Sequence, residues 1–246
     1  MSTIEQELEI DHWARAVETR PQDAHAWFHL GAARLGIDDY DGAVVAFGRA
    51  ADLDPRNAPA CHNLGIALLR LCDFRRAINA FERCVAVDPL CAGAWRNLGA
   101  TWSNLGEQRR AIAAFDLAIA LEPDHADTQS NLGIACAKDG QTARAVAAFR
   151  RAVELNPGNV GAWSSLALTC TDSGDFRNAV AAARKGVELD PSFGVAWYAL
   201  ALAHAHLGQH SLACDARHRL EKVDPDFARE RASEMDRVLS LARRAG

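Results

Sequence analysis

The sequence lacks the short motifs that indicate a catalytic or cofactor site. It contains no glycine-rich phosphate loop, no Gly-x-Ser-x-Gly elbow, no His-Glu-x-x-His motif and no Cys-x-x-Cys pair. Paired acids such as Asp38-Asp39 fall between expected helices, where they cap helix ends or face solvent. We therefore expect that the protein is not an enzyme, and that it has no catalytic residue, no bound cofactor and no resident metal.

Long apolar runs and long basic runs are absent too. No segment reaches the ~18 apolar residues of a membrane span, and the N-terminal MSTIEQELEID is acidic rather than basic and then apolar. The formal net charge is -5, which disfavours a nucleic-acid backbone as partner. Seven cysteines, an odd number, argue against a complete disulfide set and for a reducing compartment. The expectations are no membrane insertion, no nucleic-acid partner and a cytoplasmic location.

Proline is scarce but regularly spaced. Seven of the eight prolines follow one another at intervals of 34 residues: Pro21, Pro55, Pro89, Pro123, Pro157, Pro191 and Pro225. Four other positions keep the same phase. They are occupied by Leu30, Leu64, Leu98, Leu132, Leu166 and Leu200; by Gly31, Gly65, Gly99, Gly133, Ala167 and Ala201; by Ala43, Ala77, Ala111, Ala145, Ala179 and Ala213; and by Phe47, Phe81, Phe115, Phe149, Ala183 and Arg217.

Within each 34-residue period, apolar residues recur at spacings of three and four, which predicts two helices with one buried face each. The small residues at Gly31 and Ala43 allow close approach of the two backbones, and Trp27 and Phe47 fill the space beside them. Asp-Pro or Glu-Pro pairs such as Asp54-Pro55 and Glu122-Pro123 end the second helix, because proline offers no N–H and disfavours helical geometry in the preceding residue. Stacked hairpins would share one continuous core.

These residues resemble the tetratricopeptide repeat family, whose unit is a helix, a turn and a second helix. The resemblance implies an all-α fold, a right-handed α-solenoid (superhelix) of 34-residue helix-turn-helix repeats. We expect one solenoid over 1–246, and its parts are a half-repeat helix at 4–21, six repeats at 24–57, 58–91, 92–125, 126–159, 160–193 and 194–225, and a capping helix at 226–245.

The two ends depart from the repeat pattern. Residues 4–19 read as a second helix without its first, which would leave an apolar strip of Ile4, Leu8, Ile10 and Val17 exposed. Either self-association through this half-repeat or a simple terminal cap would follow. At the other end we expect one helix that begins at Asp226 and has an apolar face of Phe227, Met235, Val238, Leu239 and Ala242.

In this family the first helices line a groove that holds extended peptides, so the resemblance implies a peptide site along them. The phase of the repeat places ten candidates there: Phe28, His29, His62, Asn63, Arg96, Asn97, Asn104, Asn131, Lys138 and Tyr198. Arg96 is the expected anchor for a carboxylate or phosphate. Asn63, Asn97 and Asn131 would form a ladder whose amides pair with peptide N–H and C=O groups. The alternative is that these asparagines reflect the family consensus only.

Histidines raise the question of a metal site. His25 and His29 are four residues apart, with His62 in the next repeat, and His204, His206 and His210 form a second group. No acid or cysteine completes a ligand set, so we interpret them as polar lining.

We therefore predict a non-catalytic scaffold or assembly factor that binds an extended segment of a protein partner. The alternative is an accessory or targeting subunit of a separate enzyme, for example one associated with a glycosyltransferase.

Overall fold

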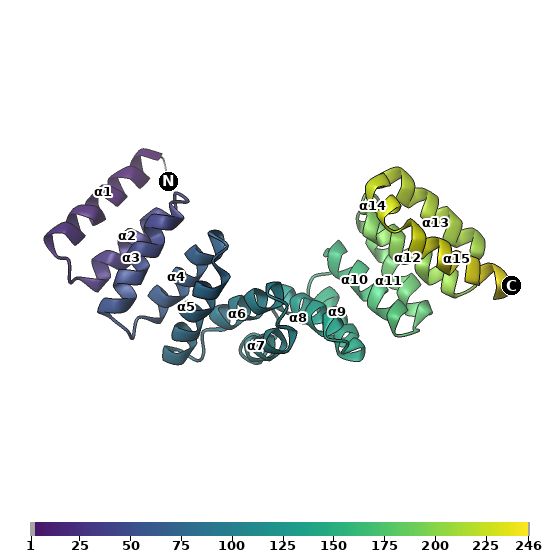
Figure 1. Ribbon diagram of the computed structural model, residues 1–246, viewed down its shortest axis with the longest axis horizontal. Coiled ribbons are helices and arrows are strands. Elements are labelled where there is room, and N and C mark those ends of the chain that lie inside the picture. Colours follow the sequence, from purple (N-terminus) through teal and green to yellow (C-terminus); the bar gives the residue numbers. More distant parts are fainter. Residues whose placement is uncertain (1–2, 246) are drawn as a thin grey trace. The chain divides into compact units, whose positions relative to one another are not determined.

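The computed structural model describes residues 3–245, and the side chains of residues 5–240 among them. Within these residues the chain forms helices and no strands, and no helix is long and apolar enough to span a bilayer. Figure 1 shows the helices following one another as short rods joined by turns. They are α1 (Thr3–Thr19), α2 (Ala24–Leu35), α3 (Tyr40–Leu53), α4 (Ala58–Arg70), α5 (Phe74–Val87), α6 (Ala92–Asn104), α7 (Gln108–Leu121), α8 (Ala126–Lys138), α9 (Thr142–Leu155), α10 (Val160–Asp172), α11 (Phe176–Leu189), α12 (Gly194–His206), α13 (His210–Val223), α14 (Pro225–Glu230) and α15 (Ala232–Ala245).

Consecutive helices pair into hairpins, and within each of two parts of the chain the hairpins stack in chain order. The pairs are α2 with α3, α4 with α5, α6 with α7, α8 with α9, α10 with α11 and α12 with α13. Between hairpins, α3 packs on α4, α5 on α6, α9 on α10 and α11 on α12. These contacts divide the chain into two compact units, Met1–Pro123 and Asp124–Gly246. Each unit is a stack of helical hairpins, so the expected all-α solenoid architecture is confirmed.

A glycine on the first helix faces a phenylalanine ring on the second in four hairpins. The pairs are Gly31 with Phe47, Gly65 with Phe81, Gly99 with Phe115, and Gly133 with Phe149. A Cβ atom added to any of these glycines would lie 2.5–2.8 Å from the nearest ring carbon, which is inside van der Waals contact. The two helices therefore sit as close as they do because the glycine has no side chain.

The fifth and sixth hairpins change both members of this pair together. In the fifth, Ala167 replaces the glycine and Ala183 replaces the phenylalanine, and both alanines are fully buried. Without the ring there is room for a methyl group on the facing helix. In the sixth, Ala201 faces the position of Arg217, whose guanidinium forms ion pairs with Glu221 and Asp236. A carboxylate partner is what a half-buried arginine requires.

Each tryptophan that lies six residues after one of the regularly spaced prolines forms a hydrogen bond with that proline. The indole Nε1–H of Trp27 donates to the Pro21 carbonyl oxygen at 3.0 Å, and Trp95 donates to the Pro89 carbonyl at 2.9 Å. The same bond joins Trp163 to Pro157 and Trp197 to Pro191. The hydrogen bond satisfies the one polar group of a ring that otherwise packs as core.

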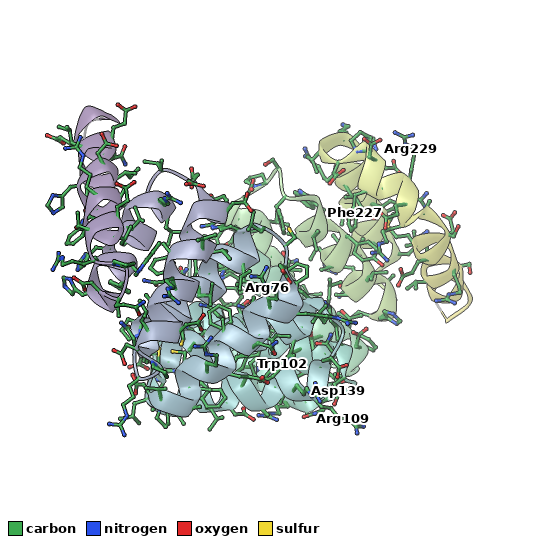
Figure 2. All side chains as sticks on the ribbon, turned by 60° about the vertical axis from the view of Figure 1, so that its left-hand side comes forward. Arg76, Trp102, Arg109, Asp139, Phe227 and Arg229 are labelled. Carbon is green, nitrogen blue, oxygen red and sulfur yellow. The ribbon has the colours of Figure 1, made fainter. Side chains whose placement is uncertain are left out.

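The C-terminal cap differs from the single helix expected over 226–245. It consists of α14 and α15, with a break at Arg231. The cap residue of α14 is Asp224, whose carboxylate accepts from the N–H of Phe227 at 3.1 Å, rather than Asp226. Figure 2 shows Phe227 directed inward among the C-terminal helices, whereas Arg229 points outward from α14. The break lets Phe227 and Met235 pack in one cluster.

The apolar strip expected on α1 is smaller than the sequence suggests. Val17 is buried, and Ile10 packs with Trp13 against Leu30 of α2. Leu8 is 64% exposed. The helix thus directs most of its apolar face onto α2. The side chains of Ile4 and Ala242, which the sequence analysis included in the two apolar faces, lie outside the described residues.

We predict that Gly99→Ala destabilises the protein. The added methyl would lie 2.6 Å from the ring of Phe115, which is 1% exposed and has little room to move, so unfolding free energy should fall by about 1–3 kcal/mol. Gly48→Ala, in α3, is the matched control, because no atom lies within 4 Å of its added Cβ. It should be neutral or stabilising by up to about 1 kcal/mol. Urea unfolding followed by circular dichroism measures both, and equal midpoints would contradict the packing argument.

Candidate functional site

A row of polar side chains links α4 and α6, the first helices of two neighbouring hairpins in the N-terminal unit. The Nδ2 amide of Asn97 donates to Nε2 of His62 at 3.1 Å, across 35 residues of sequence. Arg96, beside Asn97, forms an ion pair with Glu122, the residue that follows α7. The structure thus brings three sequence-predicted residues together and adds Glu122, which the sequence analysis did not include.

Arg96 differs from the free anchor expected from the sequence. Its side chain is 28% exposed and its guanidinium is already bound to the Glu122 carboxylate. An anionic ligand would therefore have to displace or share this carboxylate. The repeat gives a weak signal for the pairing, because Glu122 replaces the aspartate that precedes proline in the two preceding repeats.

His62 is held in a partly buried pocket. Its ring lies 5.7 Å from that of Phe81, centre to centre, and the Cβ position of Gly93 is 3.5 Å from its Nε2. Burial, and after it the charge of Arg96, lowers the pKa of His62 below its ordinary value of 6.5. The imidazole is therefore neutral near pH 7, and its Nε2 accepts from Asn97 while Nδ1 carries the proton.

Phe28 and His29 of α2 have different neighbours. His29 stacks on Trp13 with ring centres 4.6 Å apart and planes 15° from parallel. Nε2 of His29 lies 3.0 Å from Nε2 of His25. Phe28 is half-buried and meets Phe47 edge-on at 5.7 Å, so part of its ring belongs to the core.

The remaining asparagines are in different surroundings. Asn63 is half-buried on α4, and Asn104 is exposed at the end of α6. Asn131 and Lys138 are exposed on α8, in the second compact unit. The structure therefore places Asn63 and Asn97 within one unit, and Asn131 in the other.

Tyr198 is not available in the way that the repeat phase suggests. It is 5% exposed, and its ring contacts Phe227 edge-on at 5.5 Å. The guanidinium of Arg231 lies 5.9 Å from the ring centre. Burial, and after it a hydrogen bond to Glu234, raises the pKa of Tyr198. The two C-terminal helices cover this tyrosine, which a repeat pattern ending at Pro225 cannot reveal.

The second histidine group is dispersed among separate contacts. His204 is buried with Nδ1 2.6 Å from the Gln209 side-chain oxygen, and His206 stacks on Phe176 at 4.7 Å. Nε2 of His210 lies 3.6 Å from the Cys214 sulfur. Among the described side chains, no three His, Cys, Asp or Glu residues are grouped as a metal site would require.

Comparison with known families gives one match. The tetratricopeptide repeat model matches residues 10–58, 62–118, 103–160 and 171–216, which together make up most of the chain. No match was found among the curated protein sequences.

Solved structures share the architecture. One is a crystal structure of YrrB, described as a TPR protein with an unusual peptide-binding site. Its TM-score is 0.70 at 19% identity, and the match covers 76% of this chain and 96% of the YrrB chain. MamA has a TM-score of 0.64 at 27% identity, over 66% of this chain and 95% of its own. PilF of Pseudomonas aeruginosa has a TM-score of 0.68 at 17% identity, and the match covers 87% of this chain and 100% of PilF. At the identities of YrrB and PilF, the likeness shows the fold alone.

We predict that His62 makes stability depend on pH. Its folded-state pKa is lowered, so between that value and about 6.5 the unfolded chain binds a proton that the native chain does not. Its contribution to stability is therefore complete above pH 6.5 and is lost as the pH falls through this window. In His62→Gln the unfolding free energy should fall less steeply between pH 7 and pH 5.

The matched control is His218→Gln on α13, since the His218 side chain is 64% exposed. Denaturant unfolding at a series of pH values measures the difference. If the pH profiles of wild type and His62→Gln run parallel, the burial argument for His62 is wrong.

Proposed function

The chain belongs to the tetratricopeptide repeat family, and from this we propose that it is a non-catalytic scaffold that binds an extended segment of a protein partner. The proposed site runs along the first helices of the N-terminal unit. The observation that carries it is the polar row of His62 on α4, Asn97 and Arg96 on α6, and Glu122 just after α7. The family fold supports a role in protein interaction, and the polar row supports the proposed location of the binding site.

The chemistry of the row suits a peptide backbone. Asn63 and Asn97 each offer two amide donors and one carbonyl acceptor, which match a peptide's own N–H and C=O groups. Asn97 uses one donor on His62, so its carbonyl oxygen and its other N–H stay available to a ligand. The description of YrrB as having a peptide-binding site shows that a chain of this fold can take such a ligand.

Arg96 gives the row one cation that can bind an acidic group of the ligand. An incoming carboxylate can exchange with Glu122 on the Arg96 guanidinium, and this exchange keeps the half-buried cation paired throughout. His62 is neutral near pH 7 and adds no competing charge. The cost of removing Glu122 makes the expected affinity modest, so several contacts along the segment have to share the binding energy.

Three finer statements belong to the proposal. In the second unit, exposed Asn131 and Lys138 would offer a further set of contacts on α8. The cytoplasmic location rests on the seven cysteines, none of which forms a disulfide within the described residues. Self-association through α1 would rest on its exposed Leu8. The accessory-subunit alternative makes the same contacts and differs only in the identity of the partner.

The test is to identify the partner by cross-linking and affinity capture, and then to measure binding of synthetic peptides tiled across its sequence. We predict that one tile binds the wild type and that Asn63→Ala/Asn97→Ala weakens it by about 10- to 30-fold, because each lost hydrogen bond contributes ~1 kcal/mol. Fluorescence anisotropy of the labelled peptide gives the dissociation constants.

Arg75→Ala, an exposed change on α5, is the control and should leave the affinity unchanged. Circular dichroism verifies that the double variant stays folded. Equal binding by the wild type and the double variant would refute the proposed site. An enzyme as the captured partner would support the accessory-subunit alternative.

A further inference from the structure

We propose that His25 and His29 of α2 form a two-histidine site for a divalent transition-metal ion that binds imidazoles side by side, such as Ni²⁺ or Cu²⁺. The two residues are four positions apart, so a helix places them on one face, one turn after the other. This site is separate from the polar row on α4 and α6 and does not depend on the proposed peptide binding.

The separation of the ring nitrogens fits such an ion. Nε2 of His25 and Nε2 of His29 are 3.0 Å apart. Two imidazole nitrogens at about 2.0–2.1 Å from one metal, in neighbouring positions of a square or octahedral shell, lie roughly 2.9–3.0 Å from each other. Tetrahedral positions would separate them by about 3.4 Å. The distance therefore favours square or octahedral geometry.

The distance between the ring centres is compatible with a shared metal ion. The ring centres lie 4.3 Å apart. A straight N–H···N hydrogen bond would place both nitrogens on the line between the centres, which would then be about 5.3 Å apart. Two imidazoles directed at one metal would have centres roughly 4.5 Å apart. The observed value is closer to the second arrangement, and the metal ion would take the place of the hydrogen bond that joins the two nitrogens.

The surroundings support the orientation, and acidic side chains lie on the neighbouring helix α1. The indole of Trp13 stacks on His29 and fixes its ring, and the ring of His25 lies 5.9 Å from the same indole. The helix α1 carries five acidic side chains and one arginine, which favours a cation beside it.

The site would be open on its solvent side. His25 is exposed and His29 half-buried, so an ion can reach both nitrogens from solution. No third protein ligand completes the set among the described side chains, and water would fill the other coordination positions. Imidazole nitrogen suits Ni²⁺ and Cu²⁺, and their affinities for such ligands exceed that of Co²⁺.

The test uses the full chain, without an affinity tag, titrated with Ni²⁺, because Ni²⁺ does not oxidise the free cysteines. Calorimetry should show binding to the wild type that His25→Ala and His29→Ala each weaken at least about tenfold, since loss of one ligand removes the chelate. X-ray absorption of the loaded wild type should show two imidazoles per nickel. Quenching of Trp13 fluorescence should accompany binding and be absent in Trp13→Phe, which keeps both histidines.

His218→Ala is the control for an isolated exposed histidine and should bind as the wild type does. Both alanine variants remove side chains that are not fully buried, and circular dichroism verifies their folding. The proposal is overturned if His25→Ala binds Ni²⁺ as tightly as the wild type, or if the loaded wild type shows fewer than two imidazoles on the metal.

Discussion

The contact between a glycine and a phenylalanine ring inside the first four hairpins is the constraint on which the other packing depends. Because the Cβ position of Gly99 lies 2.6 Å from the Phe115 ring, the two helices can approach only if that position stays empty. This spacing sets how far the first helices project from the core, and thus where side chains such as Asn97 can reach those of the preceding hairpin. The exchange of both partners for Ala167 and Ala183 in the fifth hairpin is consistent with a joint requirement.

Two pairs of polar side chains fix the surface along α4 and α6 in the N-terminal unit. His62 and Asn97 share a hydrogen bond, and Arg96 and Glu122 share their charges. This pairing holds the side chains in fixed orientations before any ligand arrives, which reduces the entropy that binding would otherwise cost. It also means that a ligand gains only the difference between its own contacts and those it replaces.

The 34-residue period was sufficient to predict the hairpins and the close helix packing, because Gly99, Phe115 and Pro89 each have a purely local or nearest-repeat role. The site was harder to predict. Arg96 was placed on the right helix, but its pairing with Glu122 depends on side-chain conformations that phase does not specify. Tyr198 was in phase as well, yet the helices that cover it come after the period ends. A repeat pattern therefore predicts contacts between residues of the repeats, but it does not predict contacts with helices outside the repeats.

The bond from indole to proline carbonyl has a spectroscopic consequence. Trp27, Trp95, Trp163 and Trp197 each hydrogen-bond to the carbonyl oxygen of a proline that marks the end of the preceding repeat. Their emission is therefore sensitive to the integrity of four separate junctions, two in each compact unit. At Pro55 and Pro123 the corresponding residues are Cys61 and Gln129, so those junctions carry no intrinsic fluorophore of this kind. Single-tryptophan versions of this chain would report on its unfolding one junction at a time.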